Sequence, residues 1–246
     1  VECFFFQVPS AAIVNVRVAN NGVDFSESTI DFQILALPVV FLSVPSMVSS
    51  AGGAEILVMG ANFWNSSDSV CKFHKTETRA TFESSSFLRC MTPSHVVGTF
   101  SLLVSHNAID FALSEASICF LESVYVDSIS PNSGSDTNQT IISVFGLNFF
   151  RDPGQSVLCK FGDNIVSEGS LVSSSLSLCV SPMPASSSTI SVQISMNGIE
   201  YSRQKVLFLY ETQSTFLGIS PSSGPSFGGF SISVVGKLAF IKDRRN

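Results

Sequence analysis

Hydrophobic and polar residues alternate along much of this 246-residue chain. The alternation is clearest in three segments rich in β-branched residues: Ile13–Val18, Thr99–Val104 and Thr189–Ile194. A period of two is typical of strands with one buried face, and no segment shows a helical period with caps. Clusters of Ser, Gly, Pro and Asn between these segments favour turns. The pattern predicts an all-β protein built of antiparallel sandwiches.

Three kinds of landmark recur in the same order. Two of the series have intervals of 86 and 90 residues: Pro45, Pro131 and Pro221, and Gly60, Gly146 and Gly236. A fixed period of this length indicates tandem modules. We predict four of them, two complete and two partial: the C-terminal part of one module in residues 1–37, complete modules in 38–124 and 125–213, and the N-terminal part of a further module in 214–246.

The third landmark is an asparagine followed three positions later by an acid. It occurs as Asn21-Gly22 with Asp24, as Asn107-Ala108 with Asp110, and as Asn197-Gly198 with Glu200. The Asn-Gly pairs predict type I′ hairpin turns, in which both central residues have positive φ, and Ala108 weakens this prediction in the middle copy. A single acid per module is too few for a calcium site, so we expect the acids to support the turns or to solvate the strands.

The composition excludes some classes of protein. Charged residues make up 13% of the chain and the net charge is −6, so we expect no basic surface for nucleic acid. No apolar run reaches the ~20 residues of a membrane-spanning helix. The chain begins at Val1 without a leader segment, and we expect a fragment or a processed chain whose targeting signals lie elsewhere.

Four of the six cysteines follow the repeat. Cys71 and Cys159 each begin a Cys-Lys-Phe segment, and Cys90 and Cys179 follow them by 19 and 20 residues. A pair that is present in both modules favours two disulfide bonds, Cys71–Cys90 and Cys159–Cys179. Such bonds indicate an oxidising compartment, and each closes a loop that stabilises its module by about 3 kcal/mol.

Zinc binding is the alternative interpretation of these cysteines. Cys71, His74, Cys90 and His95 have zinc-like spacings. In the second module Gly162 replaces the first histidine and the second has no counterpart, although both cysteines are kept. The repeat therefore favours disulfides, and we expect no metal or other cofactor.

Two cysteines remain outside these pairs. Cys3 occupies the position of the second cysteine in each module, so its partner is expected before the first residue of the chain. Cys119 aligns with Phe208 and has no partner by the same reasoning. It is either a buried thiol that acts as a small hydrophobic residue or the site of an intermolecular bridge.

Two triplets have the sequence of N-glycosylation acceptors. They begin at Asn65 and Asn138 and both fall in predicted loops. Their use depends on secretion of the chain.

Features that suggest catalysis lack support from the repeat. The segment Gly224–Gly228 matches the Gly-x-Ser-x-Gly elbow, whose serine must be followed by a helix, but the next residues alternate as a strand. His74, His95 and His106 each belong to one module, without a repeated acid to orient an imidazole. We therefore expect no catalytic site and no enzyme activity.

Longer segments resemble a known family. The run Ile219–Gly236, with weaker copies from Val44 and Ile129, resembles the opening of IPT/TIG domains. Gly60–Phe63 and Gly146–Phe149 look like the Gly-x-Asn-Phe segment of that family. The Cys-Lys-Phe, Cys-x-x-Pro and Asn-Gly segments are similar to its extracellular, plexin-like branch. The resemblance implies tandem immunoglobulin-like antiparallel β-sandwiches.

The resemblance also implies a function. Domains of this branch serve as spacers or interaction modules at cell surfaces, so we expect a non-enzymatic, extracellular structural or adhesive repeat protein. Its expected partners are adjacent modules, other protein chains, copies of itself and surface glycans. A ligand-binding receptor ectodomain of the plexin-like type is the alternative, and it would carry an exposed patch of aromatic residues and Arg on one module.

Overall fold

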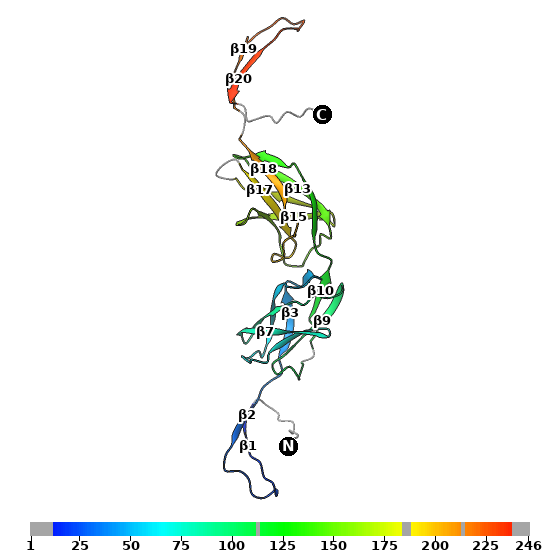
Figure 1. The fold of residues 1–246 in the computed structure, drawn as a ribbon, viewed down its shortest axis with the longest axis vertical. Helices are drawn as coiled ribbons and strands as arrows, with labels where there is room; N and C mark the ends of the chain where they lie inside the picture. Colours follow the sequence, from blue (N-terminus) through cyan, green and yellow to red (C-terminus); the bar gives the residue numbers. More distant parts are fainter. Residues whose placement is uncertain (1–11, 112–113, 184–187, 213–214, 238–246) are drawn as a thin grey trace. The chain divides into compact units, whose positions relative to one another are not determined.

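The computed structural model describes residues 12–111, 114–183, 188–212 and 215–237. Within these ranges the structure contains β-strands and no helices, which confirms the predicted all-β class (Figure 1). The chain divides into two compact units. One contains Val1–Val44, Glu55–Pro93 and Thr99–Ile118, and the other contains Pro45–Ala54, Ser94–Gly98 and Cys119–Asn246.

Twenty strands are assigned in the described ranges. The first ten are β1 (Ala12–Val16), β2 (Ile30–Ile34), β3 (Val39–Val44), β4 (Met47–Ser49), β5 (Glu55–Ala61), β6 (Val70–Phe73), β7 (Thr76–Ser84), β8 (Phe87–Met91), β9 (Gly98–Ser105) and β10 (Ser117–Leu121). The others are β11 (Tyr125–Ser130), β12 (Ser133–Ser135), β13 (Ile141–Leu147), β14 (Val157–Phe161), β15 (Ile165–Ser173), β16 (Leu176–Val180), β17 (Thr189–Ser195), β18 (Val206–Glu211), β19 (Thr215–Ser220) and β20 (Ser233–Lys237).

Two sets of eight strands have the same topology. Their orders are β3-β5-β8-β7-β6-β9-β10-β4 and β11-β13-β16-β15-β14-β17-β18-β12. In the first set β7 pairs with β6 through its first half and with β8 through its second half, so this strand passes from one layer of the sandwich to the other. β15 does the same between β14 and β16. The short strands β4 and β12 lie at the ends of the orders and pair in parallel with β10 and β18.

The repeated glycines lie where two backbones approach closely. Gly60 on β5 and Gly146 on β13 sit opposite a register shift in the strand paired with each, β3 and β11. A Cβ at Gly60 would overlap the Val39 carbonyl oxygen and the Phe63 ring, and a Cβ at Gly146 would overlap the corresponding groups of Tyr125 and Phe149. The Gly-x-Asn-Phe segment thus places its phenylalanine against its own glycine, and only a residue without a side chain fits there.

The core of the second sandwich consists of apolar side chains from both layers. Its fully buried members include Ile142, Val144, Phe161, Ile194 and Phe208. Along β13, β14 and β18 these residues alternate with more exposed neighbours, as a period of two requires. The hydrophobic pattern of the sequence therefore identified the buried face of these strands.

The hairpins near the two ends expose apolar side chains. β1 pairs with β2 and β19 with β20, each in a sheet of two strands. Ile13 on β1 is 67% exposed and Phe216 on β19 is 64% exposed. β19 and β20 repeat the register shift of the first strand pair in each sandwich. The division of the chain into two complete and two partial modules remains a prediction.

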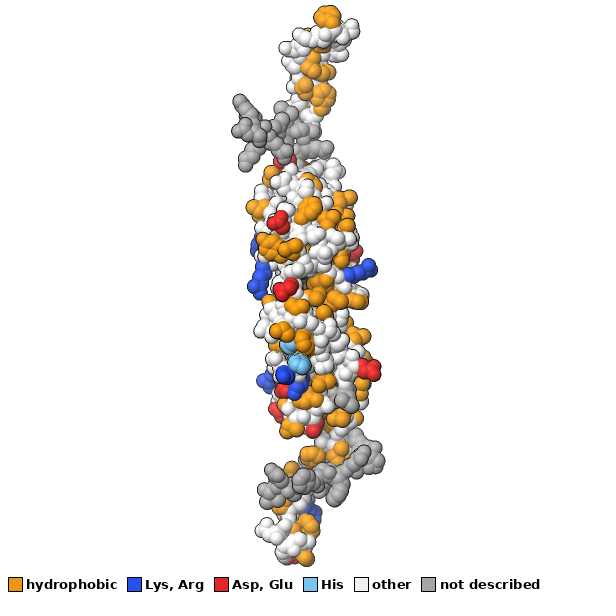
Figure 2. Space-filling view, turned by 90° about the vertical axis from the view of Figure 1, so that its right-hand side faces the viewer, with side chains coloured by type: hydrophobic (Ala, Val, Ile, Leu, Met, Phe, Trp, Pro, Cys, Tyr) orange, Lys and Arg blue, Asp and Glu red, His pale blue; other side chains and the backbone are white. Residues whose placement is uncertain are grey.

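The surface carries few charged groups. On the face drawn in Figure 2, hydrophobic side chains are widespread and charged side chains are scattered. Within the described ranges, no helix has the length and apolarity needed to cross a bilayer.

Candidate functional site

Two disulfide bonds join the layers of the sandwiches. Cys71 on β6 is bonded to Cys90 on β8, and Cys159 on β14 is bonded to Cys179 on β16. All four residues are at most 1% exposed. Each bond connects two strands that are not hydrogen-bonded to one another, so it ties together parts of the sandwich that the strand ladder leaves separate.

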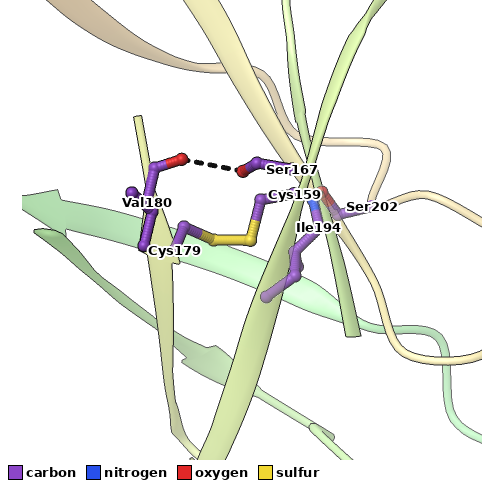
Figure 3. The surroundings of a disulfide bond; sticks show 6 residues. All are labelled: Cys159, Ser167, Cys179, Val180, Ile194 and Ser202. Atoms are coloured by element: carbon purple, nitrogen blue, oxygen red, sulfur yellow. Dashed lines mark hydrogen bonds between the residues drawn. A yellow bond between two sulfur atoms is a disulfide. The ribbon is translucent and has the colours of Figure 1, made fainter. Parts of the chain in front are cut away.

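Figure 3 shows the second disulfide with Ser167, Val180, Ile194 and Ser202 around it. Beside it, the Ser167 hydroxyl donates a hydrogen bond of 2.7 Å to the Val180 carbonyl oxygen. A Cβ at Gly169 would lie 2.7 Å from the Cys159 sulfur, so this position has no room for a side chain. In the first sandwich the residue paired with Cys90 is also small, Ala80.

The three histidines occupy separate environments. His74, with φ of 57°, lies in the turn between β6 and β7, where the second sandwich has Gly162 with φ of 64°. His95 stacks on Phe120, with ring centroids 4.9 Å apart. Within the described part of the chain, His, Cys, Asp and Glu form no group of three or more that could hold a metal ion.

His106 is the buried histidine. Its Nδ1 lies 2.9 Å from the Ser69 hydroxyl, its ring packs against Trp64 at 5.1 Å, and it is 5% exposed. Burial lowers the pKa of His106, because a charged imidazolium would lose its hydration there. No acid of the described ranges is hydrogen-bonded to it, so it lacks the orienting group of a catalytic histidine.

The Gly-x-Ser-x-Gly segment lies in the loop between β19 and β20. Gly228 has φ of 71°, and the next regular element is strand β20 rather than a helix. The serine therefore lacks the strand, turn and helix arrangement that an elbow nucleophile requires.

The repeated asparagine forms the same side-chain turn three times. In each copy its Oδ1 accepts hydrogen bonds from the backbone N–H groups two and three residues later. Its Nδ2 donates to the acid of the same turn, Asp24, Asp110 or Glu200, at 2.7 to 2.8 Å. The acids therefore support the turn, and we name these segments, 21–24, 107–110 and 197–200, the Asn turns.

The type I′ prediction for these turns was wrong. Gly22 and Gly198 have positive φ, but the asparagines before them are not among the described residues with positive φ. The side-chain carbonyl of the asparagine accepts hydrogen bonds from the backbone amides of the turn, so the turn forms with one left-handed residue instead of two. In the middle copy Ala108, with φ of 58°, takes the place of the glycine, so this copy forms the same Asn turn without a glycine.

A second repeated contact lies beside the Asn turns. The Lys72 ammonium lies 4.3 Å from the Phe111 ring centroid, and Lys160 lies 5.3 Å from that of Tyr201. These are cation–π distances, and they join the Cys-Lys-Phe strand to the aromatic residue that follows the turn. The Cys-Lys-Phe segment and the residue after the Asn turn, which lie far apart in sequence, thus contact one another in both sandwiches.

The third Asn turn is seated on the edge of β4, inside the second unit. Asn197 Nδ2 donates to the Met47 carbonyl oxygen at 3.0 Å, and the Ser49 N–H donates to Glu200 Oε2 at 2.9 Å. Asp152, 1% exposed, accepts hydrogen bonds from the Ser46 N–H and hydroxyl. Sequence patterns carry no signal for this contact, because three of the bonded groups, the Met47 carbonyl and the Ser46 and Ser49 N–H groups, belong to the backbone. Asp152 in addition does not recur in the repeat.

The remaining sequence-predicted residues lie on the surface or outside the described ranges. Asn65 and Asn138 are exposed and lie outside strands, and their glycosylation remains a prediction. Cys3 lies outside the described residues. Cys119 is a free, partly buried cysteine.

The alignment of Cys119 with Phe208 was wrong by one residue. The N–H of Cys119 and the N–H of Leu209 donate to equivalent carbonyls, those of Ser46 and Asn132. Leu209 is therefore the counterpart of Cys119, and Phe208 corresponds to the fully buried Ile118. Because successive residues of a strand face opposite sides, Cys119 points away from the core and is partly buried, where the first interpretation expected a buried thiol.

Comparison with known proteins gives a consistent assignment. The chain is 23% identical over 234 residues to human Fibrocystin-L, a match that covers 92% of this chain and 5% of that protein. The extracellular region of plexin A4 has a similar fold, with a TM-score of 0.55 and 15% identity over 89% of this chain and 21% of that one. The chain thus spans a small part of each relative.

The family model described as "IPT/TIG domain" matches residues 38–118 and 125–210. These two ranges hold more than half of the chain and contain both sets of eight strands almost completely. They also contain both disulfide bonds. The chain therefore belongs to the IPT/TIG family, as a tandem repeat of immunoglobulin-like β-sandwiches.

Proposed function

We propose that this chain is part of a non-enzymatic extracellular or cell-surface protein in which tandem IPT/TIG modules space or assemble other components. The observation that carries the proposal is the buried disulfide bond present at the same place in both sandwiches. Disulfides persist in secreted and surface proteins and are rare where thiols are kept reduced.

The surroundings of these bonds support a structural role. The four sulfur-bearing residues belong to the buried cores, where they are shielded from exchange with external thiols, and the redox-active alternative requires an accessible low-pKa thiol. The sandwiches present neutral, hydroxyl-rich surfaces and strand edges, which suit contacts with other modules, other chains or surface glycans.

Peptide mapping of the protein isolated from its natural source, with and without reductant, tests this proposal. We expect the Cys71 peptide to be linked to the Cys90 peptide and the Cys159 peptide to the Cys179 peptide until reductant is added. Alkylation of Cys119 without reductant would distinguish the free thiol of the structure from an intermolecular bridge. Free thiols at the four paired positions would contradict the extracellular assignment.

Electron microscopy of the particles distinguishes the structural role from a receptor ectodomain. Regular polymers or ordered lateral contacts support a spacer or assembly protein. Isolated particles that bind a soluble ligand through one module favour the receptor alternative.

A further inference from the structure

The contact between the third Asn turn and β4 shows how an edge strand is recognised. One edge of β4 pairs with β10: the Cys119 N–H donates to the Ser46 carbonyl oxygen at 2.9 Å, and the Ser50 N–H donates to that of Leu121 at 2.7 Å. The backbone groups of the alternate residues, 47 and 49, face the other way. The Asn turn uses these groups, a carbonyl and an N–H two residues apart, as described above.

Strand β12 presents the same edge in the second sandwich. It pairs in parallel with β18 as β4 does with β10. The Leu209 N–H donates to the Asn132 carbonyl oxygen at 2.9 Å, and the Asp136 N–H donates to that of Glu211 at 3.1 Å. By the same alternation, the Ser133 carbonyl and the Ser135 N–H face away from β18. β12 ends its sheet order, so no described strand pairs with this edge.

The Asn turn at residues 107–110 is present without such an edge beside it. Asn107 and Asp110 have the same internal hydrogen bonds as the seated turn, but both are exposed, whereas Asn197 is 2% exposed. The apolar residue of the turn is 78% exposed at Ile109 and 44% exposed at Ile199. The turn at 107–110 is therefore preformed, and within the described residues it contacts no edge of the β4 type.

We propose that the free edge of β12 is a docking site for an Asn turn of another IPT/TIG module, and that in solutions of this chain the turn at 107–110 of a second copy occupies it. The chain itself shows the occupied state, because Asn197 and Glu200 bind the equivalent edge of β4. The free edge and the free turn are different surfaces of one chain. Their contact is heterologous, and it generates open chains of molecules rather than closed dimers.

The chemistry of the contact sets its specificity. The carboxylate of Asp110 would accept a charge-assisted hydrogen bond from the Ser135 N–H, and the Asn107 amide would donate to the Ser133 carbonyl oxygen. Unpaired edge groups of a sheet favour this kind of pairing. The biological meaning of the docking rests on the proposed function, as the step by which modules assemble.

Sedimentation velocity over a series of concentrations tests the proposal with the full chain. We expect the unmodified chain to associate. Two variants should each weaken association roughly tenfold or more, because the turn variant loses both hydrogen bonds and the edge variant loses the one donated by residue 135. The turn variant is Asn107→Ala with Asp110→Ala. The edge variant is Ser135→Pro, which removes an N–H on the free side of an edge strand, where proline is tolerated.

Mixing the two variants provides the decisive measurement. The turn variant keeps an intact edge and the edge variant keeps an intact turn, so an equimolar mixture should form one-to-one dimers that do not grow further. Asn21→Ala with Asp24→Ala is the matched control and should associate like the unmodified chain. Far-UV circular dichroism checks that every variant is folded.

Three results would overturn the docking proposal. They are a monomeric unmodified chain at every concentration, association that both variants leave unchanged, and association lost only in the control variant. None of these results bears on the disulfide mapping described above, so failure of the docking proposal and failure of the proposed function remain distinguishable.

Discussion

Replacing Ala108 by glycine should stabilise the sandwich that contains it. Ala108 has φ of 58° in a position where the equivalent residues, Gly22 and Gly198, have φ of 74° and 82°. A left-handed conformation costs a residue with a side chain about 1–2 kcal/mol. Glycine adopts this conformation without that penalty, so the substitution removes strain from the folded state.

The gain is partly offset in the unfolded state. Glycine gives the unfolded chain more conformational freedom than alanine, which costs roughly 0.4–1 kcal/mol of stability. The net increase in the free energy of unfolding is therefore about 0.5–1 kcal/mol. For a module of this size, such an increase moves the urea midpoint upward by roughly 0.5 M.

Trp64 makes the measurement specific to one sandwich. It is the only tryptophan of the chain, and its ring packs against His106, two residues before the substituted position. Its fluorescence during urea unfolding therefore reports the sandwich that carries Ala108. An unchanged slope with a raised midpoint would identify a change in stability.

The reverse substitution is the matched control. Gly198→Ala should destabilise the other sandwich by about 0.5–1 kcal/mol, because alanine is strained at this positive φ. No steric clash adds to this cost, since the new Cβ would lie 3.5 Å from Gln155 and 4.0 Å from Leu158. The circular dichroism transition of that sandwich should move downward. A lower midpoint of the Trp64 transition for Ala108→Gly would refute the strain argument.

Three further outcomes follow from the structure. Replacing Cys159 and Cys179 together by alanine should lower the free energy of unfolding of their sandwich by about 3 kcal/mol, measured by calorimetry, and an unchanged melting temperature would contradict the loop-closure argument. Gly146→Ala should cost about 2–3 kcal/mol, because its Cβ overlaps a backbone carbonyl and a ring; a variant as stable as the unmodified chain in urea would disprove the close approach. Burial lowers the pKa of folded His106, so the unfolded chain binds its proton more strongly, and stability should decrease as the pH falls below about 6.5 and level off below the folded pKa. The Trp64 urea midpoint at several pH values should show this decrease, and His106→Gln should reduce it; an equal pH dependence in the variant would assign it to other groups.

Much of the fold could be predicted from local patterns. Alternating hydrophobic residues identified strands, because a strand with one buried face needs an apolar residue at every second position. The repeat acted as an internal control that separated shared cysteines from unshared histidines. It could not fix the register at Cys119, because a shift of one residue in alignment exchanges the two faces of a strand.

The candidate contact surface was less predictable. The Asn turn was visible as a repeated motif, but its conformation depends on side-chain hydrogen bonds that an Asn-Gly pair does not specify. The seated contact joins the side chains of Asn197 and Glu200 to backbone groups of Met47 and Ser49. Every residue has a backbone carbonyl, and every residue except proline has an N–H, so sequence gives no indication of which of them remain free.

The sequence by itself determined the strand content, the modular repeat and which cysteines form the two disulfide bonds, since each depends on residue type and spacing. Only the tertiary structure decided which edge of β4 the third Asn turn covers and which edge of β12 stays free. The physical reason is that a strand edge is made of backbone hydrogen-bonding groups. Their availability depends on which strands lie beside them in the folded protein, not on the side chains that the sequence records.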